Sequence, residues 1–234
     1  MRVNIIKEGG QIVNRKLVVI LTTLLLTPSL FGFAAGETPT GSTDKLGASF
    51  TLSLVPFIGG ASGPTTLLSE TDYADTFDTG YGGRLELFYD WNPSLRGQLG
   101  IVHNRWGGKS FTGGEFPVGA QFDDFRLTGF YIGVKYRFRE ASRLRPFVLG
   151  NLGVARLSSV KVTDRGSEIP YWGDTIRDYF NLGGGLEYRV TKRSAIYLDV
   201  RLEAFGKPDS ENYPIAEATG GQSLPITVGF DIRF

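Results

Sequence analysis

The sequence has no cysteine, and only one histidine and one methionine, among its 234 residues. Without cysteine the chain can form no disulfide framework, supply no thiol nucleophile and carry no lipid on a cysteine. Its formal net charge is +1, so it lacks the basic excess that nucleic-acid-binding proteins carry. It also lacks any apolar run near the roughly 20 residues that a membrane-spanning helix needs. Thiol chemistry is therefore excluded, and nothing in the composition suggests a nucleic-acid partner or favours a helical membrane anchor.

Residues 1–35 have the pattern of a secretory signal peptide. Arg15 and Lys16 precede the apolar run LVVILTTLLL (17–26), and small residues follow it. A basic stretch, a short apolar run and a small-residue exit are the three parts of such a leader. We expect cleavage near Ala34–Gly36. The alternative is a transmembrane anchor, for which an apolar run of about ten residues is too short.

The chain is rich in glycine, with 32 residues, and in aromatic residues, at 13%. Both are typical of many strands joined by turns. After a polar linker at 36–45, apolar residues alternate with small or charged ones, and this period of two predicts strands. The predicted strands lie at 46–59, 79–91, 95–105, 126–138, 145–157, 179–190, 195–205 and 223–234.

These strands are long, and the connections between them alternate between long and short. Each strand has about ten to thirteen residues, more than the average globular strand and near the 9–11 that cross a bilayer at a tilt. The alternation of connections is typical of a barrel threaded through a membrane, with short periplasmic turns and long outer loops. The sequence therefore predicts that residues 46–234 form an all-β fold, an eight-stranded antiparallel up-and-down transmembrane β-barrel, with both ends in the periplasm.

The two columns of side chains along each strand differ in chemistry. The final stretch SLPITVGFDIRF (223–234) has an apolar column from Leu224 to Phe234, with small or charged residues between. Alternation alone also fits a soluble all-β protein with its apolar column inside. Strand length, the leader and the near-balance of opposite charges favour a narrow polar lumen, because a charge outside bulk water needs a partner. The predicted lumen charge network is Arg84, Glu86, Asp90, Arg96, Lys135, Arg137, Glu187, Arg189, Asp199, Arg201, Glu203, Asp231 and Arg233.

Cross-strand neighbours supply partners for some of these charges. Residues directly opposite one another on antiparallel strands lie about 5 Å apart, within reach of long side chains. Eight strands leave an interior just wide enough for side chains, so the charges predict a plugged lumen. The expected pairs are Asp90 with Arg96, and Glu187 and Arg189 with Asp199 and Arg201.

The last strand resembles that of a known family. Phe230, Ile232 and Phe234 alternate along it and end on an aromatic residue. In this the chain resembles the small bacterial outer-membrane β-barrel proteins, which include outer membrane proteins A, W and X. The resemblance implies location in the bacterial cell outer membrane, contact with outer-membrane lipid and lipopolysaccharide, and recognition of the last strand by the assembly machinery. We expect a monomer with no cofactor and no nucleic-acid partner.

A plugged lumen favours a structural or surface-interaction role over catalysis. The first alternative is a narrow porin-like channel for small or hydrophobic solutes, which resemblance to outer membrane protein W suggests. The second is a lipid A-modifying enzyme, since related barrels use a histidine with a serine near the outer rim, and histidine is the usual base for a hydroxyl nucleophile. His103, the one histidine, points outward by parity, and Arg105 stands where such a serine would be. The sequence therefore predicts no catalytic, cofactor or metal site.

The long loops are rich in aromatic and acidic residues. Asp72, Asp75 and Asp78 lie in the first loop, where carboxylates could hold Ca²⁺ or Mg²⁺, alone or bridging to lipopolysaccharide phosphates. Their spacing fits no EF-hand-like loop, so solvated loops are the favoured interpretation. Trp106 and Trp172 are expected either at the outer membrane interface, as in aromatic girdles, or on an adhesive surface.

Overall fold

The computed structural model describes residues 45–60, 73–113, 116–138, 142–209 and 219–234. The predicted signal peptide (1–35) lies outside these ranges, and so does the predicted linker apart from Lys45. Within the described ranges, no helix has the length and apolar character needed to cross a bilayer.

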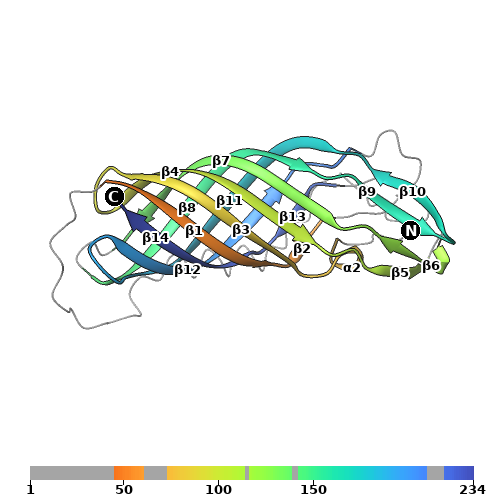
Figure 1. The fold of residues 1–234 in the computed structure, drawn as a ribbon, viewed down its shortest axis with the longest axis horizontal. Coiled ribbons are helices and arrows are strands. Elements are labelled where there is room, and N and C mark those ends of the chain that lie inside the picture. Colours follow the sequence, from red (N-terminus) through yellow and green to blue (C-terminus); the bar gives the residue numbers. More distant parts are fainter. Residues whose placement is uncertain (1–44, 61–72, 114–115, 139–141, 210–218) are drawn as a thin grey trace, which may run out of the picture. The chain divides into compact units, whose positions relative to one another are not determined.

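Eight antiparallel strands follow one another in chain order and close into a barrel (Figure 1). Residues of the first strand pair with the last one in a continuous register, from Gly47 opposite Arg233 to Leu54 opposite Ile226. The predicted barrel is therefore confirmed. The strands are β1 (Leu46–Val55), β3 (Gly80–Asp90), β4 (Leu95–Trp106), β7 (Phe125–Arg137), β8 (Leu144–Leu157), β11 (Thr175–Arg189), β12 (Ser194–Phe205) and β14 (Ile226–Arg233).

Two prolines interrupt the first and last predicted strands without ending the sheet. Pro56 separates β1 from β2 (Phe57–Gly59), and Pro225 lies between β13 (Gly221–Ser223) and β14. Proline has no N–H to donate to a ladder, but both carbonyl groups still accept. The amide of Leu224 donates to the Pro56 carbonyl at 2.9 Å, and β2 pairs with β13 beyond it.

The alternation of side chains places the apolar column on the outer face of the wall. Phe230, Ile232 and Phe234 are 45%, 44% and 59% exposed, whereas Arg201 and Glu203 are 0% and 1% exposed. The polar columns therefore face the interior. This orientation excludes the alternative of a soluble protein with an apolar core inside the sheet.

The second and third long connections, which were expected to be loops, contain a sheet of their own. Its order is β10-β9-β6-β5, and we call it the extramembrane sheet. Its alternating stretches are too short to match the pattern of a bilayer-crossing strand, which is why the sequence prediction missed them. The strands are β5 (Ser110–Gly113), β6 (Phe116–Phe122), β9 (Val160–Asp164) and β10 (Ser167–Trp172).

The barrel has two chemically different ends. We call the end with the tight turns at 91–94 and 190–193, together with Lys45, Arg143 and Phe234, the turn end. The opposite end, where the long connections leave, is the loop end. A short helix, α2 (Tyr73–Thr76), lies in the first long connection.

Candidate functional site

The interior of the barrel at the turn end is organised around Asp90. Arg96 donates from Nε to its Oδ1 at 2.8 Å, Arg137 from Nη2 to the same oxygen at 2.9 Å, and Arg233 from Nε to Oδ2 at 2.9 Å. Arg96 also donates to Asp231 at 2.5 Å. Asp90 and Arg96 are cross-strand partners, as expected from the sequence, but the other contacts join strands that are not neighbours in the wall.

Glu187 is the second acidic centre of this end. It accepts from Arg145 and, at 3.1 Å, from Nε of Arg137, and the Lys135 amine lies 3.8 Å away. Arg145 was not among the predicted lumen charges. It shares the inner face of β8 with Phe147 and Leu149. Because these two neighbours are apolar, the sequence pattern did not show which column of β8 faces inward.

Two further acids, Glu203 and Glu86, lie nearer the loop end. Glu203 accepts from Arg84, from the Tyr179 hydroxyl at 2.5 Å and from Nδ2 of Asn104 at 2.9 Å. Glu86 accepts from the Tyr131 hydroxyl at 2.5 Å and lies 3.5 Å from a guanidinium nitrogen of Arg201.

The expected pairing of Glu187 and Arg189 with Asp199 and Arg201 across the β11–β12 hairpin is wrong. In the register, Glu187 faces Tyr197, and Gly185 faces Asp199. Glu187 and Asp199 are therefore diagonal neighbours of like charge. Each forms its ion pairs with other residues. Arg201 binds the Asp199 on its own strand, at 2.9 Å. Arg189 lies half-buried at the turn end.

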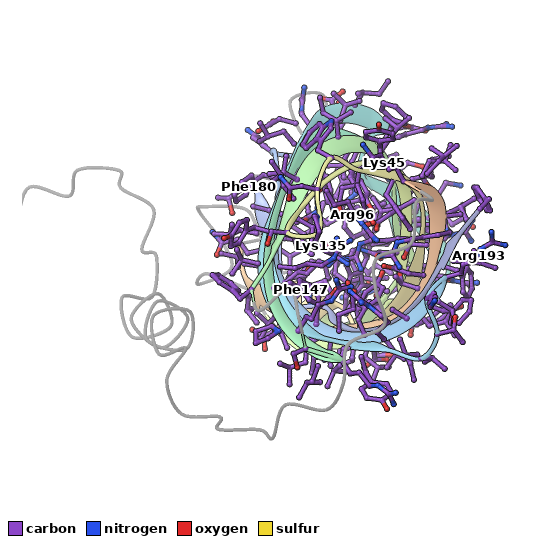
Figure 2. The ribbon with its side chains drawn as sticks, turned by 90° about the vertical axis from the view of Figure 1, so that its left-hand side faces the viewer. Lys45, Arg96, Lys135, Phe147, Phe180 and Arg193 are labelled. Carbon is purple, nitrogen blue, oxygen red and sulfur yellow. The ribbon has the colours of Figure 1, made fainter. Side chains whose placement is uncertain are left out.

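Lys135 lies inside the lumen near Phe147 (Figure 2), and it faces two aromatic rings that contact each other edge to face. Its Nζ lies 4.4 Å from the centroid of Phe147 and 4.2 Å from that of Tyr197. Such a cation–π arrangement stabilises an ammonium group that has left water. Among the described residues, this amine has no hydrogen-bond acceptor.

All the predicted lumen charges except Arg189 are buried. With Arg145 added and half-buried Arg189 included, the interior holds eight basic and six acidic side chains among the described residues, where the sequence prediction had seven and six. The excess positive charge lies towards the turn end, where Arg145, Arg189 and Lys135 join the groups around Asp90.

A cluster of aromatic side chains fills the loop end of the interior, and we call it the aromatic plug. Phe57 stacks on Trp106 with ring centroids 4.6 Å apart, and Trp106 stacks on Phe125 at 5.3 Å. The indole of Trp106 donates to the Val55 carbonyl at 2.6 Å. The plug consists of Phe57, Tyr73, Phe77, Trp106, Phe122, Phe125, Tyr171, Trp172 and Phe205.

The expectation that Trp106 and Trp172 lie at the membrane interface or on an adhesive surface is therefore wrong. They are 0% and 1% exposed. Trp106 falls on the inward column of β4, and the extramembrane sheet brings Trp172 against Phe125 at 5.6 Å. Parity along the strand predicts the first position, but the second depends on a sheet that the sequence prediction missed.

Helix α2 contributes Tyr73 to the plug. Its hydroxyl donates to the Thr219 carbonyl at 2.9 Å. Burial, with a smaller contribution from Tyr171, raises the pKa of Tyr73 well above its usual value. The phenol therefore stays protonated and remains a donor, which fixes α2 to the connection that precedes β13.

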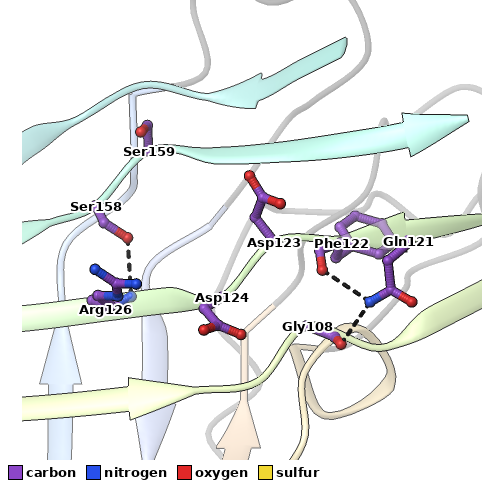
Figure 3. A pocket seen from close by; sticks show the side chains of 8 residues that line it. All are labelled: Gly108, Gln121, Phe122, Asp123, Asp124, Arg126, Ser158 and Ser159. Atoms are coloured by element: carbon purple, nitrogen blue, oxygen red, sulfur yellow. Dashed lines mark hydrogen bonds between the residues drawn. The ribbon is translucent and has the colours of Figure 1, made fainter. Parts of the chain in front are cut away.

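A shallow cavity of about 480 Å³ lies outside the barrel, where the extramembrane sheet meets the rim (Figure 3). Its lining includes Asp123, Asp124, Arg126 and Ser158. Asp124 is the partner of Arg105. Within the described part of the chain, no three histidine, aspartate or glutamate side chains gather as metal ligands would. Of the three first-loop aspartates, Asp72 lies outside the described residues.

His103 lies on the outer face of β4. Its Nδ1 is 2.8 Å from the Thr128 hydroxyl on β7, and both side chains are exposed. The position agrees with the parity prediction.

The fold and interior define a closed eight-stranded membrane barrel with an ionic lumen. The chain belongs to the family described as outer membrane protein beta-barrel domain, whose profile matches residues 25–234. It is therefore a small outer-membrane β-barrel protein. A comparison with curated protein sequences finds no match.

Solved structures of other outer-membrane barrels are similar. Neisserial surface protein A (NspA) is 17% identical, with a TM-score of 0.51 over 81% of this chain and 97% of that one. OprG from Pseudomonas aeruginosa is 12% identical, with a TM-score of 0.49 over 86% and 100%. Ail, the attachment invasion locus protein of Yersinia pestis, is 14% identical, with a TM-score of 0.48 over 82% and 100%. The match to NspA shows the shared fold and no more.

Proposed function

We propose that this protein is a non-conducting, non-enzymatic barrel that reinforces the outer membrane and presents its extramembrane sheet outside the cell as an interaction surface. The observation that carries the proposal is the burial of the lumen side chains. Arg137, Arg201, Asn104 and Trp106 are all 0% exposed. The lining of a water-filled channel stays accessible to water, so these values support an occluded interior.

Two independent layers close the lumen. The ionic network around Asp90, Glu187 and Glu203 crosses it from wall to wall, and the aromatic plug covers it at the loop end. Breaking a buried ion pair strands a charge in a medium of low polarity, which costs several kcal/mol. A conducting path would require both layers to rearrange, so the closed state is the resting state in this proposal.

The extramembrane sheet supplies the interaction surface. Its β9–β10 hairpin turns at Arg165 and Gly166, whose φ angles are 50° and 82°, as a tight hairpin of this kind requires. Lys161 and Glu168 flank that turn as an exposed pair, with Nζ and Oε2 2.7 Å apart. The hydrogen bond and charge of Lys161 lower the pKa of Glu168. The surface around the hairpin is therefore polar and of mixed charge, as interface rims are.

Planar-bilayer recording of the refolded barrel tests closure. Heat-modifiable migration on a gel first confirms that the barrel has folded. We expect a silent bilayer, because no water-filled path crosses the two layers. Discrete single-channel steps from the folded protein would instead support the alternative of a narrow channel and overturn the proposal.

An epitope tag inserted at Gly166 tests presentation of the sheet. We expect antibody to reach the tag on intact cells. The matched control is the same tag in the turn at 190–193, at the other end of the barrel, which antibody should reach only after the outer membrane is permeabilised. The reverse pattern would show that the extramembrane sheet faces the periplasm.

A further inference from the structure

The turn end is basic on its outer surface as well as inside. Lys45, Arg143, Lys192 and Arg193 are all exposed there, and Figure 2 shows the barrel from this end, with Lys45 and Arg193 at its rim. Among the residues that the structure describes, the acidic side chains near this end are those of Asp90, Glu187 and Asp231, and each is buried in the lumen.

The exposed acids lie at the loop end. Asp78, Asp123, Glu168 and Asp174 are exposed in the long connections and the extramembrane sheet, and there they have basic partners. Lys161 pairs with Glu168, and Arg156 pairs with Asp174. The two ends therefore differ: the described surface is mixed in charge at the loop end and basic at the turn end.

Aromatic side chains mark the height of the membrane interface at the turn end. Tyr89, Trp91, Tyr136, Tyr188 and Phe234 project from the outer face and are 43–59% exposed; we call them the turn-end girdle. Tyrosine and tryptophan favour the level of lipid headgroups, where the ring is in apolar surroundings and the polar atom is wet. Lys45 directly precedes β1, and Arg143, Lys192 and Arg193 lie in the connections next to this girdle. With the girdle at the headgroup level, these four side chains can reach lipid phosphates.

The interior strengthens the positive potential of this end. The buried charges there include Arg96, Lys135, Arg137, Arg145 and Arg233, against the three acids Asp90, Glu187 and Asp231. Half-buried Arg189 adds one more positive charge. The wall has a low dielectric constant and screens such charges less than water does, so this excess adds to the field of the exposed residues.

We propose that the turn end binds the phosphate headgroups of anionic phospholipids in the leaflet that surrounds it, and so enriches them around the barrel. The turn-end girdle sets the depth, and Lys45, Arg143, Lys192 and Arg193 supply the charge. A basic side chain near an anionic membrane surface favours association with it. The turn end selects a headgroup with a net negative charge, such as phosphatidylglycerol, over a zwitterionic headgroup, whose own cation neutralises its phosphodiester.

Tryptophan fluorescence reports the lipids at this end. The chain has three tryptophans, of which Trp91 is 51% exposed at the turn end, while Trp106 and Trp172 are 0% and 1% exposed. Lipids brominated near the headgroup end of the acyl chain quench only a tryptophan that they touch. A Trp91→Phe variant supplies the unquenched background of the two buried indoles.

The experiment reconstitutes the full barrel in phosphatidylcholine bilayers that contain brominated phosphatidylglycerol or, at the same fraction, brominated phosphatidylcholine. We expect phosphatidylglycerol to compete for the Trp91 site roughly threefold better at low salt, and the preference to vanish in high salt. Equal quenching by the two lipids, or a preference that salt leaves unchanged, would overturn the proposal.

Variants that lack basic side chains at one end of the barrel show which end causes the preference for phosphatidylglycerol. The variant K45S/R143S/K192S/R193S should lose the preference for phosphatidylglycerol. The control variant K109S/R126S/K161S/R165S loses the same number of charges at the loop end and should keep it. A preference retained by the first variant would assign the selectivity to another surface. If the first variant does not fold, the salt titration of the unaltered protein still decides the matter.

Discussion

Arg96 of β4 and Asp231 of β14 meet across the barrel interior, with Nη1 2.5 Å from Oδ2, although β3 and β1 lie between their strands in the wall. Their side chains are 1% and 0% exposed. The pair therefore joins two strands that are not neighbours in the wall, in a part of the lumen that is shielded from solvent. Its loss should destabilise the whole barrel.

Changing Asp231→Asn should destabilise the folded barrel by about 3–5 kcal/mol, because it leaves the guanidinium of Arg96 buried with one partner fewer. The measurement is the free energy of unfolding in urea, from lipid vesicles. A loss well below 1 kcal/mol would show that water reaches this part of the lumen.

The matched control is an exposed ion pair of the same type. Glu168→Gln removes the acid that binds Lys161 in the extramembrane sheet, where the two side chains are 64% and 53% exposed. Exposed pairs contribute little, since water already stabilises both charges. We expect the stability of this variant to be unchanged.

The two acidic partners of Arg96, Asp90 and Asp231, show which features were predictable from the sequence. A period of two is a property of each strand alone, so the strands, the inward column and the Asp90–Arg96 pair could be predicted. The contact of Arg96 with Asp231 depends on the curvature of the closed wall, which brings non-neighbouring strands together. No local pattern encodes that distance.

The aromatic plug was unpredictable for a related reason. Trp172 lies in a connection whose strands are short and pair with one another, and its place depends on tertiary packing rather than on periodicity. Arg145 was missed because apolar Phe147 and Leu149 share its inward column. Comparing this column with the inward charge of β7, Arg137, across the short link would have identified its face.

The plug should be essential to stability. Phe125→Ala removes a side chain that is 0% exposed and contacts Trp106 and Trp172, and the cavity left behind should cost about 3–5 kcal/mol. The control on the same strand is Phe130→Ala, whose side chain is 49% exposed on the outer face. Lipid can fill the space there, so its loss should be smaller. Urea unfolding of both variants measures the difference, and equal losses would contradict a packed plug.

A glycine on the inner face of β8 makes room for Tyr131. A Cβ added at Gly153 would lie 2.0 Å from the Phe130 carbonyl oxygen and 2.7 Å from the Tyr131 Cα, and this backbone cannot easily yield. Gly153→Ala should therefore destabilise by about 1–3 kcal/mol. Gly150→Ala is the control, because its nearest neighbour is a Leu182 methyl at 3.7 Å. A Gly153→Ala barrel as stable as the Gly150→Ala barrel would show that the wall adjusts there.

His103 should not act as a catalytic base. Its Nδ1 lies 2.8 Å from the Thr128 hydroxyl, and no carboxylate orients the ring among the contacts that the structure describes. A base that activates a hydroxyl nucleophile normally has such a third group. We expect His103→Ala to leave the acyl pattern of lipid A unchanged when mass spectra are compared between cells that express the two proteins at equal levels. A lipid A species that is produced with the unaltered protein and lost with His103→Ala would contradict the non-enzymatic assignment, and Thr128→Val would then test whether the hydroxyl takes part.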